Sequence, residues 1–418
     1  MKAFILSIGD ELLIGQTVNT NAAKIGESLT SKRISIHEIR VVGDEREKIL
    51  SAFREGYDNN DLVIVTGGLG PTHDDITLKC VADFFETELV INDAILEDIK
   101  QFFQKRGRPL TKINEQQALV PKIGRPIRNT KGTAPGVWIE REGKIFVVMP
   151  GVPHEMSEMM DSFILPRLSE KMTSTEGYIS TLNLLTTGIP ESMLFERLGN
   201  LDELLQGAKL AFLPNQYGVK MRITVSGKDE EDASNKISEI EQKIRGLVGR
   251  YIYGKNNDTM EEVVGRLLKE RGLKIATAES CTGGLIANRL TNVSGSSAYY
   301  ESGIICYTNA SKVENLKVDE DLIQKFGAVS LEVARQMAEG VKSVSGSDIG
   351  LAVTGIMGPT GATKDKPVGL VYVSLCDDKI CAVKEFRFGD DRLLNKDRTS
   401  QAALDMLRRN LLSIPYDE

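Results

Sequence analysis

The sequence predicts an α/β protein with a doubly wound, mostly parallel sheet at its amino end. A small α+β module and a second α/β domain are expected to follow. The chain has 418 residues, too many for one ordinary domain. Short apolar runs alternate with amphipathic helical runs over residues 1–171. A polar, turn-rich segment followed by a helix-capping signal marks a new domain near residue 255.

The first domain, residues 1–171, is expected to pair its strands in parallel and to cover both faces of the sheet with helices. Its apolar runs have the length of strands, and the runs between them have the apolar spacing of helices. The expected strands are residues 3–8, 35–42, 62–65 and 144–149. The expected helices are residues 20–29, 46–57, 76–84 and 94–103.

The central module, residues 172–254, combines alternating strands with one long charged helix. Strands are expected at 181–186, 221–226 and 251–253, and the helix at 231–247. The segment from Gly246 to Gly249 has the GxxG spacing of KH domains. However, its central residues are apolar and it lies between a helix and a strand. A sequence-specific grip on RNA needs a basic loop between two helices, so we interpret the segment as structural.

The third domain, residues 255–418, opens with a strong helix signal. Thr259 and Glu262 form a capping box ahead of an apolar stripe, and Gly272 ends that helix. Strands are expected at 273–278, 303–306 and 351–353, and a helix at 285–290.

Composition limits the partners and the compartment. The formal net charge of −7 argues against nucleic acid, because phosphate binding needs a basic surface. No apolar run is long enough to span a bilayer, and the first one reads as a strand, so we expect a cytoplasmic protein without a membrane partner. The odd number of cysteines predicts reduced thiols. The five cysteines are Cys80, Cys281, Cys306, Cys376 and Cys381.

Ser280 lies between a predicted strand and the helical run 285–290. Unpaired N–H groups and the helix dipole at such a position favour a reactive oxygen and an oxyanion, which makes Ser280 a candidate nucleophile. Gly283 and Gly284 would let a substrate approach the backbone. The alternative is that Ser280 is an N-cap, and Cys281 is a rival nucleophile.

The base for such a serine cannot be a histidine, because none follows His154. A Ser-His-Asp triad is therefore impossible in this domain, and a lysine is the available base. Lys312 follows the strand 303–306, and Tyr307 is placed to relay a proton. A lysine acts as a base only if burial or a nearby cation lowers its pKa; otherwise Lys312 is a solvated surface charge.

Two further stretches of this domain suit a ligand. Thr354 and Gly355 follow a strand, and glycines there let backbone N–H groups face a ligand. Arg392 offers a guanidinium that fits a phosphate bidentately. The alternatives are an ordinary turn and a surface arginine.

In the first domain, glycines follow the strand 62–65 at the end where parallel sheets bind ligands. Their N–H groups can cradle a phosphate, although no lysine of a P-loop follows. The candidate phosphate- or nucleotide-binding residues are Thr66, Gly67, Gly68, Gly70, Pro150 and Gly151.

Acidic residues beside these glycines suit a hard divalent ion. The candidate metal ligands are His73, Asp74, Asp75, Asp10 and Glu11. The alternative is that Asp74 and Asp75 cap the helix 76–84, since aspartate is a favoured cap.

AESCTGG, YTNASK, TGIMGPTG, KPVG and FGDDR together resemble the nicotinamide-nucleotide amidase domain of the CinA family, over nearly all of residues 259–415. The resemblance implies that Ser280 attacks the carboxamide of nicotinamide mononucleotide, with Lys312 as base assisted by Tyr307. Arg392 would hold the phosphate, and no cofactor is implied. The other implied substrate contacts are Cys281, Thr282, Gly283, Asn309, Thr354 and Gly355.

GDELLIGQTVNTN, TGGLGPTHDD, NTKGTAPG and MPGVPHEM resemble the molybdopterin-binding fold at the amino end of CinA proteins, over about residues 1–170. The resemblance implies a divalent-metal-dependent pyrophosphatase that cleaves ADP-ribose to AMP and ribose 5-phosphate. Asp74, Asp75 and His73 would hold the metal or position water, with Asp10 and Glu11 behind them.

Together the resemblances predict a bifunctional enzyme of pyridine-nucleotide salvage and a homodimer. Its ligands would be nicotinamide mononucleotide and ADP-ribose. Two alternatives stay open. The first domain is a binding module for a pterin cofactor, or the protein is a non-enzymatic partner in DNA uptake or recombination, as the family's competence name suggests.

Overall fold

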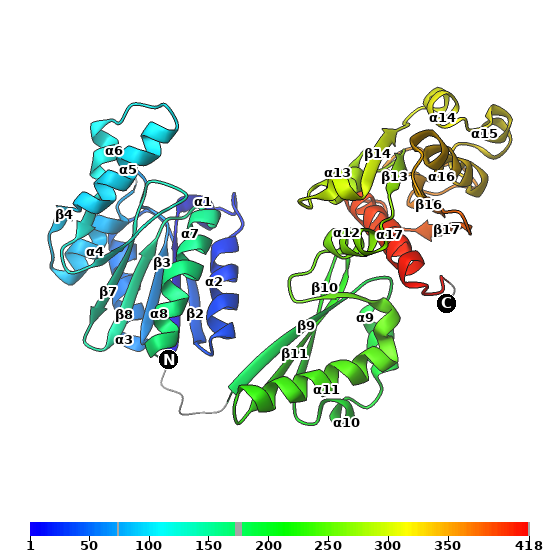
Figure 1. Cartoon of the computed structure of the whole chain (residues 1–418). Helices are drawn as coiled ribbons and strands as arrows, with labels where there is room; N and C mark the ends of the chain where they lie inside the picture. The colour runs from blue at the N-terminus through cyan, green and yellow to red at the C-terminus, as the bar shows by residue number, and fades with distance from the viewer. Residues whose placement is uncertain (73–74, 172–177, 417–418) are drawn as a thin grey trace. The chain divides into compact units, whose positions relative to one another are not determined.

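The structure is a computed structural model that describes residues 1–72, 75–171 and 178–416. The chain forms two compact units, Met1–Glu176 and Gly177–Glu418 (Figure 1). The second unit holds both the central module and the carboxy-terminal domain. Within the described ranges, every helix is too short or too polar to span a bilayer.

The first unit is built on a six-stranded sheet in the order β2-β1-β3-β8-β7-β6. Its first four strands in this order are parallel, and β7 and β6 extend the sheet antiparallel. The predicted doubly wound, mostly parallel sheet is confirmed. The strands are β1 (Lys2–Ile8), β2 (Ser35–Val42), β3 (Leu62–Thr66), β6 (Arg125–Ile127), β7 (Gly136–Arg141) and β8 (Lys144–Met149).

Helices cover both faces of this sheet. One apolar core joins the sheet to α2 (Thr20–Ser31), α7 (Pro153–Met159) and α8 (Leu165–Lys171). The other joins it to α3 (Arg46–Asn59) and α4 (Thr77–Phe85). The remaining elements are α1 (Asp10–Leu13), β4 (Leu89–Ile91), α5 (Asp93–Lys105), α6 (Lys112–Gln116), β5 (Leu119–Pro121) and a π-helical turn at Met160–Ile164.

The central module is an antiparallel sheet in the order β10-β11-β9-β12, with helices packed on a single core. Gly246 lies inside its long helix α11, and Gly249 begins the 3-10 turn Gly249–Tyr251 that follows, so no loop between two helices is formed there. The strands are β9 (Tyr178–Thr186), β10 (Lys209–Asn215), β11 (Gly218–Gly227) and β12 (Ile252–Lys255). The helices are α9 (Glu191–Leu198), α10 (Leu201–Leu205) and α11 (Glu230–Val248).

The carboxy-terminal domain has a five-stranded sheet in the order β14-β13-β15-β16-β17. The first three strands in this order are parallel, and the last two are antiparallel. The strands are β13 (Ile275–Glu279), β14 (Tyr300–Ile305), β15 (Ile349–Gly355), β16 (Leu370–Cys376) and β17 (Cys381–Arg387).

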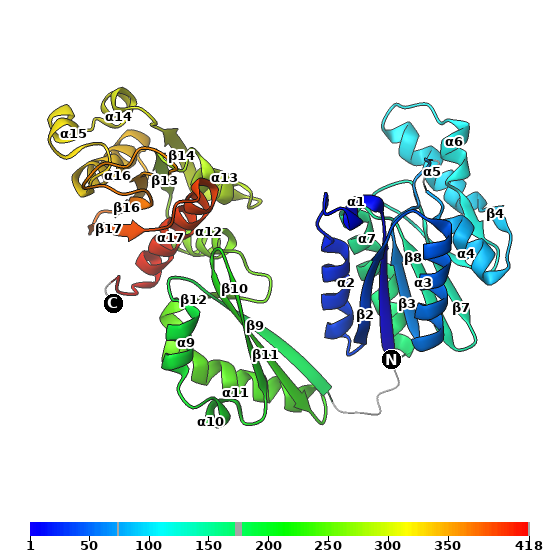
Figure 2. The ribbon, with the colours of Figure 1, turned by 180° about the vertical axis from the view of Figure 1, so that it is seen from behind.

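Helices also cover both faces of the second sheet (Figure 2). The core on one face includes α12 (Met260–Arg271), α13 (Leu285–Thr291) and α17 (Arg392–Leu412). The core on the other includes α14 (Asn309–Leu316), α15 (Glu320–Phe326) and α16 (Leu331–Ser345). The capping box of Thr259 with Glu262 is confirmed, as is the end of α12 at Gly272, which has a φ of 63°.

The parallel order of β14, β13 and β15 positions the candidate site of this domain. Because neighbouring parallel strands end at the same edge, Ile305, Glu279 and Gly355 lie along one edge of the sheet. The segments that leave these strands carry Ser280, the loop before α14, and the loop after β15. Residues far apart in the sequence therefore meet at this edge.

A buried arginine joins the two parts of the second unit. Arg408, on α17, is 1% exposed and donates to the backbone carbonyls of Arg250 at 2.7 Å and of Ile252 at 3.3 Å. Its Nε donates to the carboxylate of Asp405 at 2.8 Å. Since the first two contacts reach the end of the central module, α17 ties that module to the carboxy-terminal core.

Candidate active sites

The structure brings Ser280 and Lys312 into direct contact. The Lys312 Nζ atom lies 3.0 Å from the Ser280 Oγ atom and donates to the carbonyl oxygen of Cys306 at 2.8 Å. Lys312 is 1% exposed and Ser280 is 8% exposed. The carbonyl of Cys306 fixes one N–H direction of the amine, which leaves Nζ directed at the serine oxygen.

Burial lowers the pKa of Lys312, because an ammonium ion loses its hydration inside the protein. The neighbouring thiols of Cys306 and Cys281 act weakly in the opposite direction. No carboxylate forms an ion pair with Lys312 in the described part of the chain. The arrangement therefore shifts the equilibrium of Lys312 toward the neutral amine, which is the form that accepts a proton.

Cys281, the rival nucleophile, belongs to the apolar core of the domain and is 6% exposed. Burial raises the pKa of its thiol to about 12. Because the thiolate is the reactive form of cysteine, this environment suppresses its reactivity.

Ser280 does not cap the following helix. Helix α13 begins at Leu285, and its N-cap is Gly284. The buried carboxylate of Glu279 accepts from Thr282 Oγ1 and from the backbone N–H groups of Gly284, Ile286 and Ala287, at 2.6–3.1 Å. The N–H groups at the start of α13, which were expected to face a ligand, are therefore hydrogen-bonded to the Glu279 carboxylate.

The turn between Glu279 and α13 still offers donors to a substrate. Within the described residues, the backbone N–H groups of Cys281, Thr282 and Gly283 have no backbone carbonyl as acceptor. Gly283 and Gly284 have φ values of 64° and 96°, which suit glycine. These N–H groups replace the helix terminus as the candidate oxyanion site.

Tyr307 lies in this region and is hydrogen-bonded to Arg392. Its side chain is 59% exposed, and its hydroxyl accepts a hydrogen bond from Arg392 Nη2 at 2.8 Å. Arg392 Nη1 donates to the carbonyl of Gly358 at 2.9 Å. Among the described residues, Tyr307 forms no hydrogen bond with Lys312. Tyr307 and Arg392 instead link the loop after β14, the loop after β15 and the start of α17.

The other predicted contacts of this domain lie at the same edge of the sheet. Thr354 is buried, and its hydroxyl donates to the carbonyl of Ala328 at 2.8 Å. Gly355 ends β15 beside Val371. Asn309 is the exposed first residue of α14, the helix that carries Lys312. Thr354 is therefore oriented by a backbone contact, whereas the Asn309 side chain faces solvent.

A cavity of about 750 Å³ in the first unit collects most of the residues predicted there. It lies at the carboxyl ends of β1, β3 and β8, as expected for ligand sites on parallel sheets. The predicted residues that line it are Asp10, Glu11, Thr66, Gly67, Gly68, Gly70, Asp75, Pro150 and Gly151. His73 and Asp74 lie outside the described residues.

The glycine loop of this cavity requires glycine at its start. Gly67 has a φ of 103°, and a Cβ there would lie 2.1 Å from the carbonyl oxygen of Ile8. Asp75 does not cap α4, whose N-cap Ile76 has no side-chain hydrogen bond. The Asp75 carboxylate accepts from the backbone N–H of Thr72 at 2.9 Å instead, and so stabilises the loop.

Two acids that line the cavity were missed by sequence reasoning. Asp44 follows β2, and Glu155 lies on α7. Burial raises the pKa of Asp44, and the negative charges of Asp10, Glu11 and Asp75 raise it further. The sequence signal for Asp44 was its position just after a strand that neighbours β1.

The acids of the cavity offer the hard oxygen ligands that Mg²⁺ and Ca²⁺ prefer. The negative charges of Asp10, Glu11 and Asp75 repel that of Asp44, and a bound cation would reduce this repulsion. However, within the described residues only Glu339, Cys376 and Cys381 bring three ligand atoms within 4.8 Å of one another. The donor types thus fit a divalent ion, but the described acids do not converge on one point.

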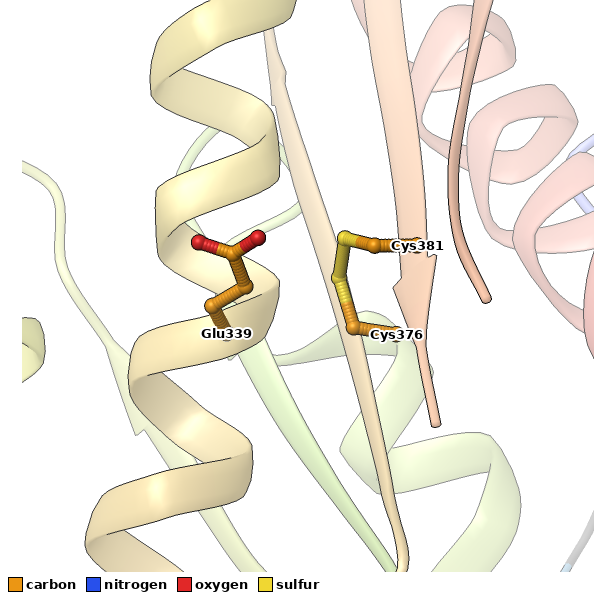
Figure 3. Close-up of side chains that lie close together, drawn as sticks. All are labelled: Glu339, Cys376 and Cys381. Carbon is orange, nitrogen blue, oxygen red and sulfur yellow. A yellow bond between two sulfur atoms is a disulfide. The ribbon is translucent and has the colours of Figure 1, made fainter. Parts of the chain in front are cut away.

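One prediction about the cysteines is wrong. Cys376 and Cys381 form a disulfide, which lies next to Glu339 of α16 (Figure 3). They are direct cross-strand partners at the ends of β16 and β17, so the hairpin register brings their side chains together. Cys80, Cys281 and Cys306 are free and buried.

The fold and its sites define a class of α/β protein with a molybdopterin-binding-like domain, a KH-like module and a carboxy-terminal domain that buries a serine–lysine pair. Three family models match the chain in this order. They are "Probable molybdopterin binding domain" over residues 4–170, "Damage-inducible protein CinA KH domain" over residues 181–254 and "CinA C-terminal domain" over residues 257–411. The chain belongs to the CinA family.

Full-length relatives agree with these matches. A CinA-like protein of Chloroherpeton thalassium is 43% identical over 98% of this chain and 99% of its own length. A CinA-like protein of Kosmotoga olearia is 42% identical over 99% of this chain and 100% of its own length. The crystal structure of the protein CinA with unknown function from Thermoplasma acidophilum is 38% identical, covers 39% of this chain and 95% of its own, and has a TM-score of 0.37.

Proposed function

We propose that the carboxy-terminal domain hydrolyses the carboxamide of nicotinamide mononucleotide to nicotinate mononucleotide and ammonia. The observation that carries this proposal is the buried contact of 3.0 Å between Ser280 and Lys312. A hydroxyl beside a neutral amine is an activated nucleophile, and this pair needs no histidine. We infer the identity of the substrate from the motifs that this domain shares with the amidase domain of the family.

The reaction follows from the groups at the site. The Lys312 amine takes the proton of the Ser280 hydroxyl as Oγ attacks the carboxamide carbon. The N–H groups of Cys281, Thr282 and Gly283, which have no backbone acceptor among the described residues, would donate to the tetrahedral oxyanion. The Lys312 ammonium then protonates the leaving nitrogen, which departs as ammonia. Water, deprotonated by the same amine, attacks the acyl-enzyme and frees the carboxylic acid and Ser280.

Incubation of the whole protein with nicotinamide mononucleotide tests the proposal, with ammonia and nicotinate mononucleotide measured together. We expect release of both in equal amounts by the wild type and no release by Ser280→Ala. Absence of ammonia with the wild type would overturn the proposal and would favour a non-enzymatic role in competence. A salt-sensitive DNA shift at physiological ionic strength would then support that role.

For the first unit we infer a metal-dependent ADP-ribose pyrophosphatase. The cavity of about 750 Å³ supports this second function, because it has the size of a nucleotide site and combines glycine loops with acids. A divalent ion, when bound, would neutralise the phosphates and lower the pKa of a water. Asp10, Glu11, Asp44 and Asp75 would hold the ion or its waters. The N–H groups of Gly68, Leu69 and Gly70, which have no backbone acceptor among the described residues, would hold a phosphate.

Release of AMP and ribose 5-phosphate from ADP-ribose tests this function. We expect activity with Mg²⁺ or Mn²⁺ and none after chelation by EDTA. Tight binding of a pterin without AMP release would instead identify a cofactor-binding module. We also propose a homodimer, which light scattering of the whole protein tests.

A further inference from the structure

Helix α17 carries a second cation at the Ser280 site, besides Arg392. Lys396 lies one helical turn after Arg392, on the same side of the helix. Its Nζ atom lies 3.6 Å from the position that a Cβ on Gly283 would occupy. The ammonium group therefore lies over the glycine turn that follows Ser280.

The two cations differ in their partners. Arg392 uses two of its nitrogens to donate to Gly358 and Tyr307, so part of its guanidinium is engaged in holding loops together. Lys396 is half-buried, and its Nζ has no acceptor within the described residues. A bound anion would give this ammonium group a charge-assisted hydrogen bond.

Two acids beside this turn and at the start of α17, Glu279 and Asp391, accept hydrogen bonds from other groups. The Glu279 carboxylate accepts four hydrogen bonds from its own turn and from α13. The Asp391 carboxylate caps α17 by accepting from the N–H of Leu394 at 2.9 Å. The amine of Lys312 contacts Ser280 and Cys306. Lys396 is therefore a cation beside the Ser280 turn that could meet a charge brought by the substrate.

We propose that Lys396 binds the phosphate of the substrate and sets the preference for a nicotinamide nucleotide over the uncharged nucleoside. This inference rests on the proposed amidase function and deepens it. Lys396 acts as a specificity-determining residue, and Arg392 shares the same anion from its remaining nitrogen while it fixes the loops. The resemblance described in the sequence analysis assigned phosphate binding to Arg392 alone.

Binding to the catalytically inactive Ser280→Ala protein tests the proposal by calorimetry, with nicotinamide mononucleotide and nicotinamide riboside as the two ligands. We expect the nucleotide to bind more tightly than the riboside. Lys396→Met should weaken nucleotide binding by about 10- to 100-fold, the loss expected for one charge-assisted hydrogen bond. Riboside binding should stay unchanged, because that ligand lacks the phosphate.

Two variants serve as controls. Lys396→Arg keeps the charge and should retain most of the preference for the nucleotide. Arg398→Gln removes one positive charge from the same helix, but Arg398 lines a different cavity, so nucleotide binding should stay close to that of the parent protein. Because Lys396 Nζ makes no bond within the described residues, Lys396→Met should fold normally, which thermal unfolding checks.

The possible outcomes separate this inference from the proposed function. Equal weakening of both ligands by Lys396→Met would overturn the phosphate assignment. Equal affinity of the parent protein for both ligands would overturn it as well, whatever the enzymatic activity. A Lys396-dependent preference for the nucleotide would support it, even if the wild-type protein released no ammonia and the amidase function failed.

Discussion

At the scale of single residues, the central feature is an amine kept inside the protein without a carboxylate beside it. Among the described residues, Lys312 donates only to a hydroxyl and a carbonyl oxygen, both neutral acceptors. An ammonium ion in that environment loses hydration and gains no opposite charge, so the neutral form is favoured. This environment suits the role of base that we propose for Lys312.

The pH dependence of amide hydrolysis should report this amine. Burial lowers the pKa of Lys312 below the ordinary 10.5, and only the unprotonated amine accepts the serine proton. Activity should therefore rise with pH through the lowered pKa and reach a plateau above it. Initial rates across pH 5 to about 10 measure the curve. Lys312→Arg should be inactive over the whole range, because a guanidinium stays charged. A rate that falls as pH rises would contradict the assignment.

Substitutions at the adjacent residues 280 and 281 should have very different effects. Ser280→Ala removes the nucleophile and should lower kcat by about 10³-fold or more. Cys281→Ala removes a core thiol whose pKa is raised to about 12, so kcat should fall by less than about 10-fold, mainly through packing. Ammonia release by both variants measures the difference. If Cys281→Ala were the inactive variant, the thiol would be the nucleophile.

At the scale of elements, the buried side chain of Glu279 stabilises the N-terminal end of α13. The Glu279 carboxylate accepts from the first turns of α13 and from Thr282, and it lies at the positive end of the helix dipole. This arrangement holds the turn of Ser280 rigid between β13 and α13. Glu279 is thus a positioning residue.

Glu279→Gln should lower both stability and turnover. The substitution removes the negative charge and points an amide N–H₂ at existing donors, so a loss of about 2 kcal/mol or more is expected. For a unit of this size, Tm should fall by roughly 4–8 °C. Glu301→Gln is the control, because Glu301 pairs with Lys274 at the surface and such pairs contribute little. An unchanged Tm in Glu279→Gln would show that the carboxylate does not hold the turn.

The elements themselves follow closely from the sequence, because apolar spacing and caps are local signals. Thr259 with Glu262 and the strand after Gly272 are examples. Contacts between side chains distant in sequence do not follow in this way. Ser280 was expected to lie at the helix start, but the Glu279 side chain competes for those N–H groups. The pairing of Cys376 with Cys381 depends on a hairpin register that spacing alone did not fix.

At the scale of the whole molecule, the buried Arg408 ties the central module to α17. Arg408→Leu would leave two backbone carbonyls without a donor and would take one partner from the buried Asp405. Breaking a buried pair on one side costs about 3–5 kcal/mol, so Tm of the second unit should fall clearly. Arg387→Leu removes an exposed arginine and should change Tm little. Calorimetry of the whole protein measures both.

The two candidate sites lie in different compact units, so a substitution that abolishes one activity should leave the other activity unchanged. Asp10→Asn weakens the acidic cavity and should abolish release of AMP from ADP-ribose while ammonia release stays unchanged. Ser280→Ala should have the opposite pattern. Assays of both reactions on each variant in the full chain test this. Loss of both activities in either variant would mean that the two sites depend on each other.

The depth of the serine–lysine pair also bears on how such an enzyme is detected. With Ser280 8% exposed and Lys312 1% exposed, bulky electrophiles that tag surface-accessible serines should leave this protein unlabelled. The shape of a reagent would decide whether it reaches Ser280, whatever its chemical reactivity. A survey that counts hydrolases by reagent labelling would then overlook the proposed amidase.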